Sequence, residues 1–252
     1  MNTDNFRDKV VLITGAAGGF GTLLATYLAN AGARLMLSDR NQDGVEALAH
    51  SLKASGAVVH SYACDISKEL QVEALIKDTI NVLERIDIAV NNAGLASPMR
   101  PLIETTEAEL DLNYAVNLKG VFFGMKYQIQ QMLGQNGGTI LNVASKAGIG
   151  GAPKLTAYCA AKHAVVGITK TAALEYARHN IRINAICPYY SPTPLVTEHI
   201  DVSLQEMLAD GSPMKRLGHP EEIVAAMLML IDPENSYMNG QAIAVDGGVS
   251  AY

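Results

Sequence analysis

Residues 10–21 read Val-Val-Leu-Ile-Thr-Gly-Ala-Ala-Gly-Gly-Phe-Gly. The opening apolar run predicts a buried strand, and the glycine cluster predicts a tight turn that opens a helix at residue 19. Such a turn lets the backbone approach a pyrophosphate, while the helix N-terminus supplies unpaired N–H groups and the positive end of its dipole. A glycine cluster alone is often only a turn, but strand, turn and helix in this order favour a dinucleotide site. Its candidate residues are Gly15, Gly18, Gly19, Phe20 and Gly21.

An acidic residue closes the next predicted strand. Asp39 follows the run Leu-Met-Leu-Ser at 35–38, and its carboxylate can accept hydrogen bonds from an adenosine ribose but would repel a 2′-phosphate. This favours NAD over NADP as the cofactor. The neighbouring Arg40 leaves an alternative open, because a guanidinium can accommodate a phosphate. If Arg40 is only a solvated residue at a helix start, it has no such role.

Short apolar runs alternate with longer amphipathic segments along the rest of the chain. Strands are predicted at 10–14, 34–38, 58–62, 86–91, 139–144, 182–186 and 242–245. Helices are predicted at 19–31, 42–54, 68–83, 157–179 and 220–231, with one or more pieces within 107–133. Gly32 and Gly56 follow two of these helices, where a left-handed cap residue is wanted.

This alternation predicts an α/β fold with a Rossmann-like, doubly wound parallel sheet of about seven strands and helices on both faces. No linker, repeat or low-complexity tract divides the sequence. We therefore expect residues 1–252 to form a single domain.

Composition and charge indicate which classes of binding partner are not expected. The formal net charge is −6 and no basic block offsets it, so a nucleic-acid partner is not expected. No run of about eighteen apolar residues and no leader pattern is present, which argues against membrane insertion and secretion. The three cysteines lack the spacing of a disulfide framework or a zinc site. We expect a cytoplasmic protein with a small-molecule substrate and no metal.

Tyr158 and Lys162 are four residues apart in a predicted helix, so their β-carbons should lie roughly 5–6 Å apart on one face. A nearby ammonium favours the phenolate and lowers the tyrosine pKa, which suits proton transfer to or from an alcohol or ketone oxygen. Ser145 follows an apolar strand whose carboxyl end should face the ligand crevice, where its hydroxyl can hold the substrate oxygen. The alternatives are a solvated helix lysine and a serine that only caps the strand end.

These motifs together resemble those of the short-chain dehydrogenase/reductase family, over nearly the whole chain. The matching segments are Thr14-Gly-x-x-x-Gly-x-Gly21, Asn91-Asn-Ala-Gly94, Asn117, Ser145 and Tyr158-x-x-x-Lys162. The resemblance implies that Lys162 also binds the nicotinamide ribose and that Asn117 holds a water linking Lys162 to solvent. A simple buried polar role for Asn117 is the competing interpretation. Further cofactor residues implied by the resemblance are Asp65, Ile66, Asn92, Ala93, Gly94, Tyr158, Lys162 and Pro188.

The sequence departs from the family at Pro188-Tyr189-Tyr190-Ser191. The family usually has Pro-Gly here, followed by a threonine that contacts the nicotinamide amide. Ser191 and Thr193 keep positions suited to that contact. Tyr189 in place of glycine implies a reshaped loop and a side chain in the pocket wall, or one that turns outward for packing or a subunit contact.

The substrate is expected to be neutral and hydrophobic. An apolar segment after Thr193 suits a lid at about residues 191–216. Candidate substrate-binding residues are Ser145, Tyr158, Gly150, Leu155, Tyr189, Tyr190 and Leu195. Few cations enter this region, so a neutral secondary alcohol or ketone fits better than a substrate with several charges. Together with Asp39, this favours an NAD-dependent enzyme that interconverts a secondary alcohol and a ketone.

Two other functions remain open. One is a 3-oxoacyl-thioester reductase that uses NADPH, and the other is a non-catalytic dinucleotide-binding regulator. The retained Asn117, Ser145, Tyr158 and Lys162 favour an active enzyme over a regulator. By resemblance to the family, a homotetramer or homodimer built through the two long helices is expected.

Overall fold

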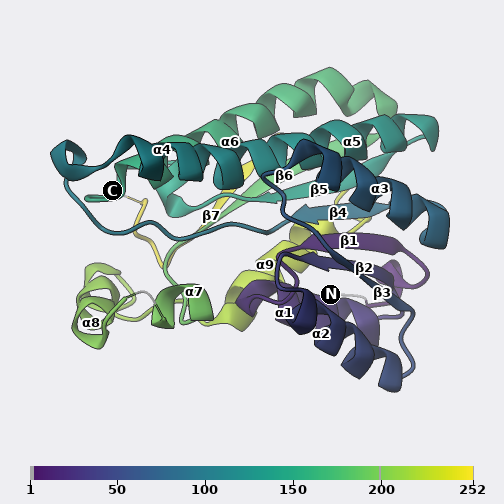
Figure 1. The fold of residues 1–252 in the computed structure, drawn as a ribbon, viewed down its shortest axis with the longest axis horizontal. Coiled ribbons are helices and arrows are strands. Elements are labelled where there is room, and N and C mark those ends of the chain that lie inside the picture. Colours follow the sequence, from purple (N-terminus) through teal and green to yellow (C-terminus); the bar gives the residue numbers. More distant parts are fainter. Residues whose placement is uncertain (1–2, 199, 252) are drawn as a thin grey trace.

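A computed structural model describes residues 3–198 and 200–251 of the chain. Its centre is a parallel sheet of seven strands in the order β3-β2-β1-β4-β5-β6-β7 (Figure 1). The strands are β1 (Val10–Thr14), β2 (Arg34–Asp39), β3 (Val59–Ala63), β4 (Ile88–Asn91), β5 (Gly138–Val143), β6 (Ile181–Pro188) and β7 (Ala242–Val245). The doubly wound α/β fold predicted from the sequence is confirmed.

Helices cover both faces of the sheet (Figure 1). One face carries α1 (Gly19–Asn30), α2 (Gln42–Ala54) and α9 (Pro220–Ile231). The other carries α3 (Glu69–Leu83), α4 (Glu107–Asn113), α5 (Gly120–Gly134) and α6 (Thr156–Tyr176). Two short helices, α7 (Pro194–Thr197) and α8 (Val202–Gly211), lie beside these layers at the lower left of Figure 1.

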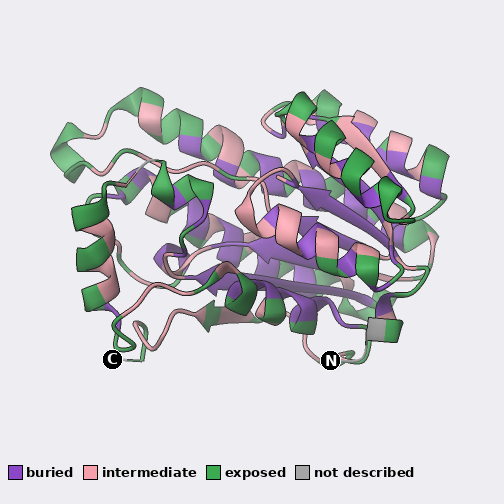
Figure 2. Ribbon diagram, turned by 90° about the horizontal axis from the view of Figure 1, so that it is seen from below, coloured by how far each residue is buried: buried purple, intermediate pink, exposed green. Residues whose placement is uncertain are grey.

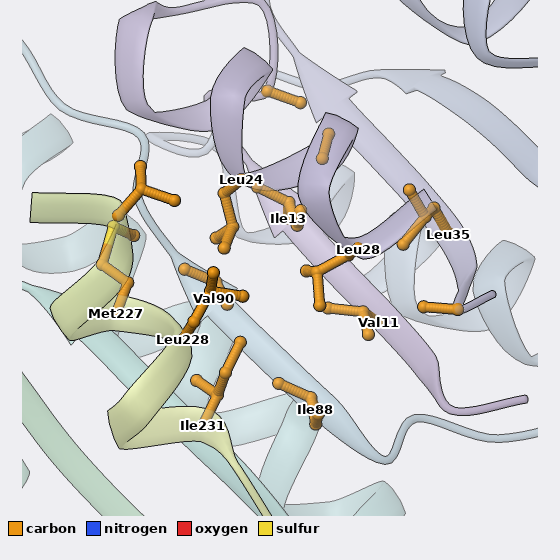
Figure 3. Packing of buried hydrophobic residues seen from close by; sticks show 14 of the residues in the cluster. Val11, Ile13, Leu24, Leu28, Leu35, Ile88, Val90, Met227, Leu228 and Ile231 are labelled. Carbon is orange, nitrogen blue, oxygen red and sulfur yellow. The ribbon is translucent and has the colours of Figure 1, made fainter. Parts of the chain in front are cut away.

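The sheet is buried because its strands are apolar on both faces. Along β1, Val11 and Ile13 pack with Leu24 and Leu28 of α1 and Met227 of α9, as Figure 3 shows. Val10 and Leu12 point to the other face, into a second cluster with residues of α3, α5 and α6. Strands buried on both faces are typical of parallel sheets, and Figure 2 shows most of the central strands in the buried colour.

The strand order predicts a ligand crevice at the carboxyl ends of the strands. The chain builds β1, β2 and β3 outward in one direction, and β4 then pairs with β1 on its other side. Ligands of open α/β sheets bind at the carboxyl ends of the strands where the order reverses in this way. Thr14 and Asn91 are register partners at that reversal, so the residues that follow them meet there.

Most predicted element boundaries agree with the structure to within one or two residues. The two predicted caps are confirmed, because Gly32 and Gly56 have φ angles of 79° and 90°. The predicted helical region 107–133 is divided by a π-helical segment at Tyr114–Lys119. The helices α7 and α8 were not predicted as helices, only as part of an apolar lid. Within the described ranges, no helix is long and apolar enough to cross a membrane.

Candidate functional site

The turn between β1 and α1 requires glycine at two positions. Gly15 has a φ of 65°, and a Cβ atom on it would lie 2.7 Å from the Cα of Ala93. A Cβ on Gly21 would overlap the carbonyl oxygen of Gly15. The turn, the start of α1 and the segment after β4 therefore approach one another more closely than side chains allow.

The N-terminus of α1 is open toward this crevice. Its N-cap residue is Gly18, which has no side chain to accept a hydrogen bond from the first N–H groups of the helix. Asn92 fixes the preceding turn, since its Nδ2 donates to the carbonyl oxygens of Thr14 and Gly15 at 3.1 and 2.9 Å. The Ala93 N–H donates to Thr14 Oγ1 at 3.2 Å. Asn92 and Ala93 thus lie at the glycine turn, where the sequence placed them.

Asp39 lies at the carboxyl end of β2 and braces the same turn. Its Oδ2 accepts a hydrogen bond from the Ala17 N–H at 3.0 Å, and its Oδ1 accepts one from the Asn41 N–H at 2.9 Å. The carboxylate is only partly buried, whereas Arg40 is exposed. A carboxylate has more lone pairs than these two bonds use, so it can still accept hydrogen bonds from a ligand.

Asp65 and Ile66 follow β3 at the same edge of the sheet. Asp65 accepts hydrogen bonds from the backbone N–H and the hydroxyl of Ser67, and these bonds hold the pKa of its carboxyl below the usual value. Ile66 is buried against Gly120, where a Cβ atom would lie 2.7 Å from Ile66 Cγ1. Both residues are therefore held in place by contacts within the chain.

The structure brings Ser145, Tyr158 and Lys162 together. Ser145 lies two residues after the end of β5, and the other two lie in the first turns of α6. Lys162 Nζ donates to the carbonyl oxygen of Val143 at 2.8 Å and lies 5.6 Å from the centroid of the Tyr158 ring. Ser145 Oγ accepts a hydrogen bond from the Ala147 N–H at 3.1 Å. Ser145 therefore does cap the strand end, and the same hydroxyl also reaches Tyr158.

Burial changes the electrostatics expected from the sequence. Burial raises the pKa of Tyr158, and a hydrogen bond from Ser145 acts in the opposite direction. Burial also lowers the pKa of Lys162 to about 8, since the side chain is only 4% exposed. The expectation of a lowered tyrosine pKa is thus wrong, because desolvation outweighs the hydrogen bond from Ser145.

Asn117 lies in the π-helical segment and is fully buried. Its Oδ1 accepts a hydrogen bond from the Leu95 N–H at 2.9 Å, and its Nδ2 donates to the Leu95 carbonyl oxygen at 3.2 Å and to Asn113 Oδ1 at 2.8 Å. A Cβ atom on Gly94 would lie 3.0 Å from Asn117 Oδ1 and 3.6 Å from Lys162 Nζ. Asn117 therefore has the buried structural role and is also close to Lys162, and its role in holding a water stays a prediction.

The loop after Pro188 faces the glycine turn. A Cβ atom on Gly19 would lie 2.6 Å from Thr193 Cγ2, and Thr193 is buried. Ser191 is also buried, and its Oγ has no hydrogen-bond partner among residues 3–198 and 200–251. A buried hydroxyl without a partner is unfavourable, so a ligand that offers a hydrogen bond would satisfy it. The glycine turn, the uncapped N-terminus of α1 and the unpaired Ser191 hydroxyl together fit a bound dinucleotide.

The predicted substrate residues do not all line one enclosed space. Leu155 is buried and forms a β-bridge with Arg100, Gly150 is partly buried, and Leu195 is 42% exposed on α7. Tyr190 is partly buried and close enough to Tyr158 for their charges to interact, and burial raises the Tyr190 pKa to about 12. Leu195 is thus not enclosed, whereas Tyr190 is near the proposed reaction centre.

The Tyr189 side chain matches neither prediction fully, since it neither clearly joins the pocket wall nor turns outward. Its hydroxyl donates to the carbonyl oxygen of Leu208 in α8 at 3.3 Å, and its ring meets Tyr190 edge to face. Its φ is negative, since it is not among the residues with left-handed backbone. The loop accommodates tyrosine without backbone strain, and the side chain packs under α8 instead of turning into solvent.

One site neighbour was missed by the sequence. Cys187 is fully buried in β6, and its sulfur accepts a hydrogen bond from the Ser145 backbone N–H. Burial raises the pKa of this thiol to about 11. Only the register of β5 and β6, in which Val143 pairs with Ile186, reveals that Cys187 lies beside Ser145.

Fold and site together define the dinucleotide-binding class of α/β proteins. A family profile described as enoyl-(acyl carrier protein) reductase matches residues 15–250. Levodione reductase of Leifsonia aquatica is 39% identical over 99% of this chain and 97% of that protein. A crystal structure of levodione reductase, 39% identical in sequence, superposes with a TM-score of 0.94 over 98% of this chain and 99% of that one.

Two further relatives agree with this result. Cyclohexanol dehydrogenase of Acinetobacter sp. (strain SE19) is 32% identical over 99% of this chain and 98% of its own length. The structure of 3-ketoacyl-(acyl-carrier-protein) reductase from Brucella melitensis complexed with NADH is 34% identical and has a TM-score of 0.90, with 97% of this chain and 99% of that chain covered. The chain belongs to the short-chain dehydrogenase/reductase family, as its motifs predicted. It is accordingly an oxidoreductase of small molecules that uses a nicotinamide dinucleotide.

Proposed function

We propose that the protein is an NAD(H)-dependent oxidoreductase that interconverts a neutral, hydrophobic secondary alcohol and the corresponding ketone. The observation that carries this proposal is the meeting of Ser145, Tyr158 and Lys162 at the carboxyl end of β5, beside the glycine turn. In this arrangement the Ser145 and Tyr158 hydroxyls can both bind one substrate oxygen, and the Lys162 ammonium lies beside Tyr158.

In the direction of reduction, the Ser145 and Tyr158 hydroxyls donate hydrogen bonds to the ketone oxygen and hold it in place. The substrate carbon would receive a hydride from a nicotinamide bound at the glycine turn. Tyr158 gives its proton to the oxygen, and because burial raises its pKa it is protonated at neutral pH. Lys162 stabilises the phenolate that remains, with Nζ 5.6 Å from the ring centroid. Asn117 assists the return of a proton. In oxidation the same residues act in reverse.

The preference for NAD rests on Asp39. Both carboxylate oxygens are fixed by backbone N–H groups at the edge of the glycine turn, so the negative charge is held at the expected ribose position. A 2′-phosphate there would be repelled. Arg40 is exposed, and a solvated guanidinium offsets this repulsion little. Similar proteins of known structure include one complexed with NADH and one with NADP bound, so the choice of NAD depends on Asp39.

The proposed substrate class rests on the surroundings of Tyr158. Tyr190 and Leu155 offer largely apolar surface, and the segment 191–216 is proposed as the lid. Two relatives are named for levodione and for cyclohexanol, which carry no charge. These names support a neutral ketone or alcohol for this chain as well.

The proposed oligomer and cytoplasmic location rest on exposed apolar residues and on the free cysteines. Phe122, Leu133 and Leu174 are exposed on α5 and α6, with Leu174 85% exposed, and this supports a homodimer or homotetramer built through those helices. The three cysteines are free, which supports a reducing cytoplasm. The chain is proposed to act as one domain.

The second candidate is a 3-oxoacyl-thioester reductase that uses NADPH. The observation in its favour is the description of the matching profile and of the Brucella melitensis reductase, both of which refer to the acyl carrier protein. Such members of the family tend to carry basic residues on the two long helices. Asn136 and His179, which lie near the ends of α5 and α6, occupy about those places here, which weakens this candidate.

A cofactor and substrate screen separates the two. The purified protein is followed at the absorbance of NADH and of NADPH against aliphatic, cyclic, aryl and steroidal ketones and one 3-oxoacyl thioester. We expect NADH-dependent turnover of a neutral ketone. A strong preference for NADPH, or turnover of the thioester alone, would contradict the proposal.

A further inference from the structure

The helix α8 is held to the body of the protein by few contacts. None of its residues is buried, and Val202 and Met207 are 70% and 60% exposed. Figure 1 shows α8 beside the two helical layers rather than packed on the sheet. A helix with so little buried surface needs other interactions to fix its position.

Tyr189 provides one such interaction at the end of α8. Leu208 is in the last turn of the helix, where carbonyl groups have no partner within the helix, and its oxygen accepts the Tyr189 hydroxyl at 3.3 Å. The Tyr189 backbone N–H donates to Val245 of β7 at 3.1 Å, so the tyrosine is itself fixed to the sheet.

The same tyrosine also contacts the proposed reaction centre through Tyr190. The two rings meet edge to face, with centroids 4.9 Å apart and planes at 85°, an arrangement that aromatic pairs prefer. The Tyr190 carbonyl oxygen accepts the Gly218 N–H at 3.1 Å, and Tyr190 interacts electrostatically with Tyr158. The contacts therefore run from α8 through Tyr189 to Tyr190, which is near enough to Tyr158 for their charges to interact.

We propose that Tyr189 is a positioning residue that holds α8 in the arrangement that binds substrate. It does so through the bond from its hydroxyl to Leu208, without touching the reacting atoms. This inference rests on the proposed function for its kinetic consequence, but the position of α8 can be measured without catalysis. If only a fraction of the molecules has α8 in place, the apparent substrate affinity falls by that fraction.

The test is Tyr189→Phe, which removes the hydroxyl and keeps the ring against Tyr190. Since 3.3 Å is long for such a bond, we expect a modest effect, about a two- to fivefold rise in KM for the ketone with kcat unchanged. Hydrogen exchange of the α8 amides should become faster by a similar factor, while exchange in α9 stays the same. Tyr237→Phe is the matched control, because Tyr237 is fully exposed and should behave as the wild type.

Three results would overturn the proposal. Wild-type KM and wild-type exchange in Tyr189→Phe would show that the bond does not position α8. A higher KM with unchanged α8 exchange would show that Tyr189 acts by direct contact with substrate. Equally faster exchange in α8 and α9 would show a general loss of stability. If neither protein turns over any ketone, the proposed function fails, and the exchange of α8 still decides whether Tyr189 anchors it.

Discussion

Replacing Lys162 by methionine should change how the stability of the protein depends on pH. Lys162 is 4% exposed, and Val143 O, at 2.8 Å, is the acceptor for its ammonium. Burial lowers its pKa from 10.5 to about 8. In the unfolded chain the lysine returns to its ordinary value of about 10.4.

The direction of the change in stability with pH follows from which state binds the proton more tightly. Between about pH 8 and pH 10.5 the unfolded chain binds the proton more tightly than the folded protein, so the free energy of unfolding of the wild type rises with pH in this window. The shift from 10.5 to about 8, at about 1.4 kcal/mol per pH unit, corresponds to about 3 kcal/mol. The methionine variant lacks this contribution. Loss of the bond to Val143 also has a cost, but that cost does not depend on pH.

The assay is urea unfolding of wild type and Lys162→Met without cofactor, from pH 7 to pH 10.5. We expect the stability of the wild type relative to the variant to increase by about 3 kcal/mol across this range. Lys170→Met is the control, because Lys170 is exposed on the same helix, and its difference from wild type should stay nearly constant. A constant difference for Lys162→Met, or one that changes in the opposite direction, would refute the assignment of a depressed lysine pKa.

Two further substitutions test the cofactor site. Asp39→Ser removes the carboxylate that accepts hydrogen bonds from the Ala17 and Asn41 N–H groups. NADH affinity, measured by fluorescence titration, should therefore fall by about 10- to 100-fold, and NADPH affinity should rise. Asp43→Ser, at an exposed position, is the control, and undiminished NADH binding in Asp39→Ser would exclude the proposed role. Gly21→Ala places a Cβ atom against the backbone of Gly15 and Ala16, which should cost about 1–3 kcal/mol and lower Tm by about 2–10 °C. Gly167→Ala, where a Cβ atom meets nothing within 4 Å, should be neutral or stabilising, and an unchanged Tm in Gly21→Ala would show that the turn can relax.

The sequence predicted the sheet well because its strands are buried on both faces. The run Val10–Ile13 is continuously apolar and is followed closely by the glycine turn, so it needs no tertiary information to be recognised. The glycine turn was predictable for a similar reason, since close backbone approach admits only one residue type. The meeting of Ser145 with Tyr158 and Lys162 followed from strand ends and helical spacing.

Features that depend on distant partners were not predictable. The π-helical segment at Tyr114–Lys119 is accompanied by the pairing of Asn117 with Leu95, which no local pattern encodes. The course of Tyr189 depends on a carbonyl group of α8, and α8 itself lacks a buried face that would give a clear periodicity. The pKa values of Tyr158 and Lys162 are dominated by burial, which only the packed structure reveals.

The most direct test of the central claim is Tyr158→Phe, assayed with NADH and the best ketone from the screen. The account predicts that kcat falls by about 10²–10⁴-fold, since the proton donor is lost while Ser145 and Lys162 remain. NADH should still bind with nearly wild-type affinity, because the glycine turn and Asp39 are untouched. Ketone reduction at the wild-type rate by Tyr158→Phe would contradict the assignment of Tyr158 as the proton donor.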